Sequence, residues 1–214
     1  MLLYYITDRT QFGGAEHART RTLLQKISEA ARCGVDLIQL REKDLSARQL
    51  EDLGREAVQC AKEASGGRTR LLINSRVDVA IAIGADGVHL PAGNLTPSQV
   101  REIWKRACPS SELPIVGVSC HTTSDAIHAA IERATFAVFA PVFEKKDTPG
   151  ATRTGLTGLR AACHEGIPVL ALGGVTLENT KSCLDQGAAG IAAIRLFQDN
   201  DIAEVVQTLR GKQV

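Results

Sequence analysis

The chain has 214 residues, of which 44% are hydrophobic and 23% are charged, a composition typical of a globular protein. Lysine and arginine total 25 against 24 aspartate and glutamate residues, so the net charge of +1 excludes a strongly basic nucleic-acid-binding protein. No apolar run approaches the roughly 18 residues of a membrane span, and the N-terminal residues lack a secretory signal pattern. We therefore expect a cytoplasmic protein that engages neither membranes nor nucleic acid.

Six cysteines are spread through apolar stretches, and no two of them form a C-x-x-C pair. A disulfide framework or a zinc site would need clustered cysteines, so we expect reduced thiols in a cytoplasmic protein. The six are Cys33, Cys60, Cys108, Cys120, Cys163 and Cys183.

A short pattern recurs along the chain at an interval of about 50 residues. Gly34–Leu40 (GVDLIQL) is followed by Gly84–Leu90 (GADGVHL), by Ala134–Ala140 (ATFAVFA) and by Gly187–Ala193 (GAAGIAA). Each copy ends a helical pattern and begins a short apolar run. A glycine at a helix C-terminus followed by a buried strand is the usual junction between a helix and a parallel strand.

Eight apolar runs are predicted as strands, and each precedes a stretch with helical spacing. In chain order, the predicted strands are Leu2–Thr7, Gly34–Leu40, Leu71–Asn74, Gly84–Leu90, Ile115–Ser119, Ala134–Ala140, Pro168–Leu172 and Gly187–Ala193. The predicted helices are Leu23–Arg32, Ala47–Ala64, Arg76–Ile83, Thr96–Ala107, Ser124–Arg133, Leu156–His164, Leu177–Gln186 and Ile202–Arg210.

This alternation of strands and helices predicts an α/β protein with a parallel sheet. Eight units with an internal repeat favour a closed (β/α)8 TIM barrel, and a doubly wound open sheet is the alternative. The open sheet is less favoured because no G-x-G-x-x-G motif follows the first strand. No linker rich in proline, glycine or serine divides the chain, so we expect a single barrel domain over residues 1–214.

Active sites of such barrels form at the C-terminal ends of the strands, which we call the mouth. Four cations follow predicted strands and would face the mouth: Arg41, Lys43, Lys146 and Arg195. Cations gathered there indicate an anionic substrate. The alternative is that some of them form surface ion pairs with Glu42, Asp44 or Glu144.

Three further features of the mouth suggest chemistry. Gly173-Gly174 follows the seventh predicted strand, where backbone N–H groups could hold a phosphate, although a tight turn would also use two glycines. His121 lies beside Ser119 after the fifth strand and is a candidate acid or base. The alternative for His121 is a hydrogen-bonded loop residue. His89 lies within a strand and is interpreted as structural.

Several of these segments together resemble one family, thiamine phosphate synthase and its relative TenI. The resemblance runs in order along nearly the whole chain and implies a (β/α)8 barrel. It rests on Tyr5–Arg9 (YITDR), Gln39–Asp44 (QLREKD), Ile73–Asp78 (INSRVD), Gly84–Leu90 (GADGVHL), Gly117–Thr122 (GVSCHT) and Gly173–Thr176 (GGVT).

The synthase joins hydroxymethylpyrimidine diphosphate to a thiazole phosphate by a dissociative displacement, with Mg²⁺ on the departing diphosphate. The resemblance implies that the pyrimidine diphosphate is held by Gln39, Arg41, Lys43 and Asn74. It further implies that Ser119 contacts the diphosphate and that Lys146 stabilises its departure. Gly174 and the end of the eighth strand, with Arg195, would hold the thiazole phosphate.

Two departures bring in alternatives. Where the synthase pattern has carboxylates for Mg²⁺, this chain has Ser75 and Asn94, which are weak ligands for that ion. TenI needs no metal, because it interconverts thiazole phosphate tautomers by proton transfer, with a histidine at the position of His121. We therefore expect a synthase-type transferase, with a TenI-like tautomerase or a non-catalytic thiazole-phosphate-binding protein as alternatives. The expected partners are phosphorylated small molecules, and a homodimer is an open option.

Overall fold

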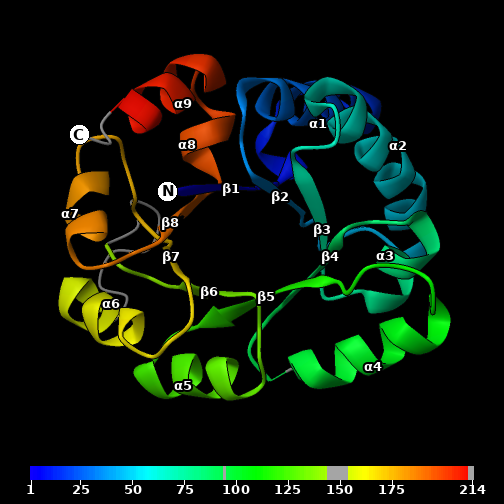
Figure 1. The fold of residues 1–214 in the computed structure, drawn as a ribbon. Coiled ribbons are helices and arrows are strands. Elements are labelled where there is room, and N and C mark those ends of the chain that lie inside the picture. The colour runs from blue at the N-terminus through cyan, green and yellow to red at the C-terminus, as the bar shows by residue number, and fades with distance from the viewer. Residues whose placement is uncertain (94, 144–153, 212–214) are drawn as a thin grey trace.

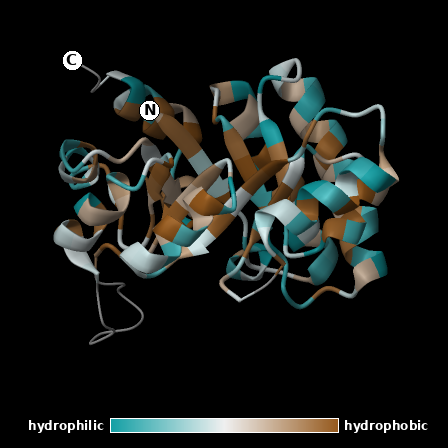
Figure 2. Ribbon diagram, turned by 60° about the horizontal axis from the view of Figure 1, so that its bottom comes forward, coloured by the Kyte–Doolittle hydropathy of each residue, from teal (hydrophilic) through white to brown (hydrophobic). Residues whose placement is uncertain are grey.

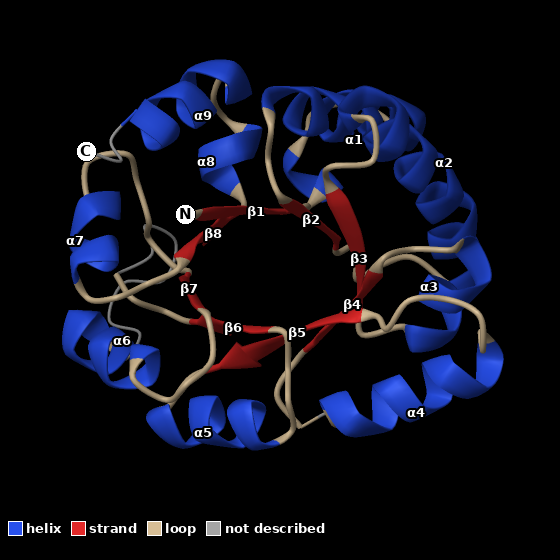
Figure 3. Ribbon diagram, in the orientation of Figure 1, coloured by secondary structure: helices blue, strands red, loops and turns tan. Residues whose placement is uncertain are grey.

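The computed structural model describes residues 1–93, 95–143 and 154–211. Eight parallel strands close into a barrel in chain order, with β8 paired to β1. Helices surround the strands on the outside (Figures 1 and 3). The predicted (β/α)8 barrel is confirmed, and the open-sheet alternative is wrong.

The strands are short and lie within or close to the predicted runs. They are β1 (Leu2–Ile6), β2 (Leu37–Leu40), β3 (Arg70–Asn74), β4 (Gly87–Leu90), β5 (Ile115–Cys120), β6 (Phe136–Phe139), β7 (Val169–Ala171) and β8 (Gly190–Ala193). The helices are α1 (Glu16–Cys33), α2 (Ala47–Ser65), α3 (Val77–Ile83), α4 (Pro97–Ala107), α5 (Thr123–Ile131), α6 (Gly155–Cys163), α7 (Thr180–Asp185), α8 (Arg195–Gln198) and α9 (Ile202–Gly211), with a 3-10 turn η1 (Arg9–Gln11).

Two helical segments differ from the prediction. Helix α1 begins at Glu16 rather than Leu23, because its first two turns are polar and carry no apolar periodicity. Helix α8 was not predicted, since four residues are too few to show a helical period. Both segments begin on the mouth side of the barrel, so the differences lie where strands lead into the loops before the helices.

The repeated junctions have the backbone that the sequence pattern predicts. Gly34, Gly84 and Gly187 have φ values of 90°, 66° and 93°, in the left-handed region that glycine enters without steric cost. The third copy has no glycine, and there Arg133 takes the left-handed conformation, with φ of 58°. The repeat therefore reflects a shared helix-to-strand geometry that the third copy reaches with a less suitable residue.

Helices α2 and α4 begin with the same side-chain arrangement. The hydroxyls of Ser46 and Thr96 accept hydrogen bonds from the backbone N–H of Gln49 and Gln99, respectively. Each glutamine side chain accepts in return from the capping backbone N–H. These capping boxes satisfy backbone donors that the first helical turn leaves unpaired, and so fix where each helix leaves the mouth.

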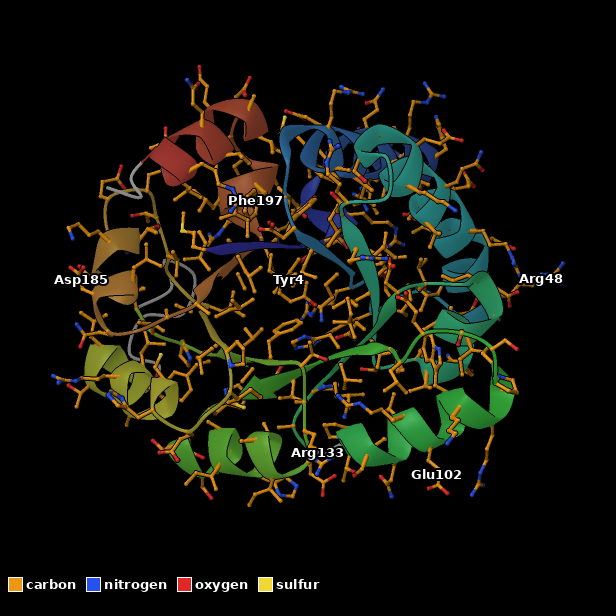
Figure 4. All side chains as sticks on the ribbon, in the orientation of Figure 1. Tyr4, Arg48, Glu102, Arg133, Asp185 and Phe197 are labelled. Carbon is orange, nitrogen blue, oxygen red and sulfur yellow. The ribbon has the colours of Figure 1, made fainter. Side chains whose placement is uncertain are left out.

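Two kinds of core hold the barrel. One lies between the strands and the surrounding helices, and the other fills the barrel itself, where Figure 4 places Tyr4 inside the ring of strands. Figure 2 shows the strands as the most hydrophobic part of the fold. The buried residues of the interior core are Tyr4, Ile6, Leu37, Leu72, Phe136, Val138, Leu170 and Ala192.

The structure also bears on the expectations about the cysteines and about membrane-spanning segments. All six cysteines are free. Within the described residues, no helix combines the length and apolar character needed to cross a bilayer.

Gly117 on β5 makes room for two rings inside the barrel. A Cβ atom at this position would lie 2.5 Å from Cζ of Phe136 and 2.8 Å from Nδ1 of His89. Phe136 cannot easily retreat, because its ring packs edge-on against Tyr4 with centroids 5.3 Å apart. A glycine is therefore required here by close packing rather than by its backbone conformation.

We predict that Gly117→Ala destabilises the protein by about 1–3 kcal/mol, the usual cost of forcing an extra methyl group into a packed core. Gly13→Ala is the matched control, because a Cβ at Gly13 meets nothing within 4 Å. Urea unfolding of the three proteins provides the comparison. Equal free energies of unfolding for the two variants would contradict the packing argument.

Candidate active site

The inward-facing side chains at the mouth divide into a polar and an apolar half. Four consecutive strands, β2 to β5, contribute Gln39, Asn74, His89 and Ser119, which form two hydrogen-bonded pairs, Gln39 with Asn74 and His89 with Ser119. The other side of the barrel contributes apolar side chains: Ile6 on β1, Val138 on β6, and Leu172 and Ile194 directly after β7 and β8. A ligand at the mouth therefore meets hydrogen-bonding groups on one side and hydrocarbon on the other.

At the ends of β2 and β3, one hydrogen-bonded group links three polar residues. Nε2 of the buried Gln39 lies 3.5 Å from Oδ1 of Asn74, whose Nδ2 donates to the hydroxyl of Ser75 at 3.1 Å. Ser75 has φ of 62°, and the N–H of Arg76 donates to the carbonyl of Asn74 at 2.8 Å. The chain thus turns sharply after β3, in a conformation that costs a non-glycine residue free energy and is frequent at functional sites.

His89 is buried inside the barrel and touches two partners. Its Nδ1 lies 3.3 Å from the hydroxyl of Tyr4, and its Nε2 lies 2.9 Å from Oγ of Ser119. Burial, together with the smaller effect of the nearby charge of Arg41, lowers the pKa of His89 to about 3. His89 is therefore neutral, and the hydrogen-bonded placement fits the structural role that the sequence suggested.

Arg41 and Lys43 follow β2 on the polar side of the mouth, Arg41 half-buried and Lys43 exposed. The sequence left open that they pair with Glu42, Asp44 or Glu144, the last of which lies outside the described residues. Instead Glu42 and Asp44 bind Arg9, and neither cation has an ion-pair partner among the described residues. Neither cation is therefore in direct contact with a carboxylate of the described residues at the end of β2.

Arg9 is the buried cation that the sequence analysis did not single out. Its guanidinium bonds to Asp44 at 2.7 and 2.8 Å, to Glu16 at 2.6 Å and to Glu42 at 3.2 Å. The hydrogen bond to Arg9 lowers the pKa of Asp44, whereas burial raises the pKa of Glu42 despite its bonds from Thr7 and Arg9. The cluster joins the end of β1 to the end of β2 and to the start of α1.

Glu42 also organises the backbone next to Arg41. It accepts a hydrogen bond from the hydroxyl of Thr7 at 2.5 Å and from the N–H of Arg9 at 3.0 Å. The oxygen of Thr7 in turn accepts from the backbone N–H of Arg41 at 3.0 Å. The buried carboxylate therefore fixes the segment that presents both cations. Thr7, Arg9 and Glu42 belong to two of the six motifs on which the resemblance rests, Tyr5–Arg9 and Gln39–Asp44, and this membership is the signal that could have identified them.

His121 lies at the end of β5, with its side chain exposed. Its Nδ1 lies 2.7 Å from the carbonyl oxygen of Ala140, which can only accept, so Nδ1 carries a proton. Its backbone N–H donates to Asp125 at 2.8 Å, in the capping box that begins α5. The side chain is thus hydrogen-bonded through Nδ1, while Nε2 contacts no partner among the described residues.

Gly173 and Gly174 both have positive φ, 96° and 64°, directly after β7. A Cβ on Gly173 would lie 2.8 Å from Cα of Pro141, so the chain could not pass this point with a side chain. The carbonyl of Gly174 accepts from Asn179 at 2.9 Å. In the described part of the chain, the N–H groups of Gly174 and Val175 donate to no acceptor, as a phosphate cradle requires.

Three predicted site residues remain: Arg195, Lys146 and Asn94. Arg195 begins α8 directly after β8, on the mouth side, and is half-buried. Gln198 of the same helix accepts from the hydroxyl of Tyr5 at 3.2 Å and from the N–H of Asp8 at 2.8 Å, which ties α8 to β1. Lys146 and Asn94 lie outside the described residues.

The expected Mg²⁺ does not fit the donors that the structure describes. Position 75 offers a neutral hydroxyl, and Glu42 and Asp44 are held by Arg9. Across residues 1–93, 95–143 and 154–211, no three histidine, cysteine, aspartate or glutamate side chains gather as a metal site would need. Mg²⁺ prefers carboxylate oxygens, so this part of the mouth is better suited to bind anions directly.

Comparison with known proteins gives a consistent picture. The family model described as thiamine monophosphate synthase matches residues 3–197. The putative thiamine-phosphate synthase 2 of Aquifex aeolicus is 40% identical over 196 residues, covering 91% of this chain and 96% of that protein. A putative thiamine-phosphate synthase of Geobacter sulfurreducens is 40% identical over 213 residues, covering 97% and 92%.

A solved structure agrees in fold over almost the full length. Thiamine phosphate pyrophosphorylase from Pyrococcus furiosus superposes with a TM-score of 0.79 at 29% identity. The match covers 98% of this chain and 94% of that one. Fold and sequence therefore point to the same group of proteins.

We predict unequal effects from neutralising the two carboxylates that share Arg9. Glu42→Gln breaks a buried ion pair and should destabilise the protein by about 3–5 kcal/mol. Asp44→Asn is the matched control, because Asp44 is 54% exposed and surface pairs contribute about 0–1 kcal/mol. Chemical denaturation of both variants measures the difference. A loss at Asp44 as large as that at Glu42 would show that burial does not set the strength of this cluster.

Proposed function

Because the chain belongs to the thiamine monophosphate synthase family, we propose that it is a transferase of thiamine biosynthesis that joins hydroxymethylpyrimidine diphosphate to thiazole phosphate. The observation that carries the proposal is the polar half of the mouth, where Arg41 and Lys43 are free of carboxylate partners among the described residues. Beside them, the hydrogen-bonded Gln39 and Asn74 offer amides to a pyrimidine ring.

The proposed reaction makes charge the main requirement. The bond between the pyrimidine methylene carbon and the diphosphate oxygen breaks, and the diphosphate leaves with the electron pair. The thiazole nitrogen then forms a bond to that carbon. Arg41 and Lys43 stabilise the negative charge that grows on the leaving group, and Lys146 is proposed for the same task. Preorganised charges of this kind contribute most where the site excludes water.

We propose that the second substrate, the thiazole phosphate, binds on the opposite side of the mouth. The N–H groups of Gly174 and Val175 would bind the thiazole phosphate, with Arg195 after β8 adding positive charge. The apolar side chains of Leu172 and Ile194 lie on this side and suit an aromatic ring. Ser119 on β5 faces the diphosphate from the polar half.

Mg²⁺ would supply further charge neutralisation to the diphosphate. The described residues offer it poor ligands, so we assign no step to it and let the protein cations carry that role. We further propose a single domain over residues 1–214, a cytoplasmic location, which suits six free thiols, and phosphorylated small molecules as partners. Homodimer formation stays an expectation.

A TenI-like tautomerase is the second candidate, and His121 favours it. The carbonyl of Ala140 fixes the proton on Nδ1, so Nε2 presents a lone pair that can accept a proton from a substrate carbon. The serine at position 75, where the synthase pattern has a carboxylate, also suits a reaction without metal.

We predict that Arg41→Ala and Lys43→Ala each weaken binding of the pyrimidine diphosphate by about 1–3 kcal/mol, the scale of a lost charged hydrogen bond. Arg48→Ala is the matched control, since Figure 4 shows Arg48 on the outer side of the helices, far from the barrel axis. Isothermal titration calorimetry gives the three affinities. Unchanged binding in both mouth variants would refute the placement of the diphosphate.

The two candidate reactions respond differently to His121→Asn. A positioned acid or base contributes about 10²–10⁴-fold, so a tautomerase should lose nearly all thiazole isomerisation. A dissociative synthase has no such proton transfer, so its turnover should fall by less than about 30-fold. The assay supplies thiazole phosphate with and without the pyrimidine diphosphate and Mg²⁺, and follows both products. Isomerisation without any synthase activity in the parent protein would replace the first candidate with the second.

Restoring the carboxylates should restore the metal site. We predict that Ser75→Asp combined with Asn94→Asp raises both Mg²⁺ affinity and synthase turnover, because Mg²⁺ prefers anionic oxygen ligands. Aspartate also tolerates the left-handed backbone at position 75. Mg²⁺ titration by calorimetry, beside the single variants, tests this. A folded double variant with parental Mg²⁺ affinity would show that the two positions do not converge on one ion.

A further inference from the structure

Three side chains form a continuous hydrogen-bonded line from the middle of the barrel to its mouth. The hydroxyl of Tyr4 lies 3.3 Å from Nδ1 of His89, and Nε2 of His89 lies 2.9 Å from Oγ of Ser119. Tyr4 is fully buried, His89 is 3% exposed, and Ser119 is partly exposed at the end of β5. The line therefore ends where the anionic ligand is expected.

A neutral histidine carries one proton, so the line has two arrangements. In the first, Tyr4 donates to Nδ1 and Nε2–H donates to Ser119, whose own O–H is left to point into the mouth. In the second, Ser119 donates to Nε2 and Nδ1–H donates to Tyr4. The second arrangement uses the serine proton inside the barrel and leaves only a lone pair facing the ligand.

The surroundings of Tyr4 decide between them. Its hydroxyl lies in the interior core, and His89 is the hydrogen-bonding partner that the described residues give it. In the second arrangement the Tyr4 O–H would have no acceptor, and an unsatisfied buried donor costs free energy. The first arrangement satisfies every donor along the line. It also places the Nε2–H dipole of His89 so that it polarises the serine hydroxyl outward.

We propose that His89 is a positioning residue that, held by Tyr4, donates from Nε2–H to Ser119 and so directs the hydroxyl proton of Ser119 toward a phosphate oxygen at the mouth. The same bond explains why Gly117 must lack a side chain, because a Cβ there would displace the His89 ring. The proposal rests on the proposed function only in taking the ligand to be a phosphate or diphosphate group.

The proton arrangement can be measured without any activity assay. In protein labelled with ¹⁵N, the ring nitrogens of His89 report which of them carries the proton. We expect a protonated Nε2 and an unprotonated Nδ1 throughout the range of about pH 5 to 8, in which an ordinary histidine titrates. Tyr4→Phe should change the Nδ1 signal. A proton on Nδ1, or a doubly protonated ring in this range, would overturn the proposal.

Calorimetry with inorganic pyrophosphate as the probe tests whether the bond from His89 to Ser119 strengthens anion binding. His89→Leu removes the donor to Ser119 and should weaken pyrophosphate binding about threefold or more. His89→Gln keeps an N–H donor of similar reach and should bind within about twofold of the parent. In the Ser119→Ala background, His89→Leu should have no further effect, because the two residues act through one hydroxyl.

The reverse proton arrangement predicts the opposite change in pyrophosphate affinity. If Ser119 normally donates to His89, then His89→Leu releases the hydroxyl and tightens binding, so unchanged or tighter binding overturns the proposal. His128→Leu, a histidine substitution on the exposed face of α5, is the control for a general effect. If His89→Leu does not fold, the ¹⁵N measurement and the Gln variant decide. Absence of synthase turnover in the parent, with these results intact, would refute the proposed function and leave this inference standing.

Discussion

The buried contact between Arg9 and Glu42 is the interaction on which the mouth depends. An isolated charge inside a protein is costly, and the two ions are tolerated because each meets further partners: Asp44 and Glu16 on one side, Thr7 on the other. Since Thr7 also binds the backbone of Arg41, the pair fixes the loop after β2. The same carboxylate that neutralises Arg9 is thereby withheld from Arg41 and Lys43. Arg41 and Lys43 are thus left without a contacting carboxylate among the described residues, although the cluster of Arg9, Glu16, Glu42 and Asp44 itself carries a net formal charge of −2.

By this arrangement a chain with net charge of +1 presents two cations at the mouth that contact no carboxylate of the described residues. Other arginines pair with neighbouring acids, as Arg70 does with Asp86 at the start of β3 and Arg76 does with Asp78 after its end. At the end of β2, Glu42 and Asp44 contact Arg9 instead. The polar half, on β2 to β5, is suited to bind charged groups, and the apolar half is suited to pack against aromatic rings. A substrate pair made of an anionic leaving group and flat heterocycles meets both needs.

The sequence was sufficient for the barrel because its repeat and its eight apolar runs are local signals that also agree with the closed sheet. It was insufficient where structure depends on distant contacts. Helix α8 is held by Gln198 through bonds to Tyr5 and Asp8, about 190 positions away in sequence, and no local pattern encodes that. Arg9 looked like one more cation at a strand end until Glu42 and Asp44 were seen around it. The sequence was enough to place cationic residues at the mouth. It was not enough to predict which of them would form ion pairs.

The loss of carboxylates at position 75, and at 94 by sequence, does not by itself make the mouth less able to neutralise a diphosphate. Two aspartates and one Mg²⁺ ion sum to zero formal charge, so removing all three leaves the net charge of a site unchanged. What disappears is direct coordination of phosphate oxygens by a metal. Hydrogen-bond donors can replace part of that contact when they are fixed in place, as proposed for the serine hydroxyl beside His89, while Arg41 and Lys43 would add positive charge. Because a donor competes with water for the phosphate oxygens, its orientation matters more once no metal holds them, and an orienting bond to Ser119 gains importance in this chain.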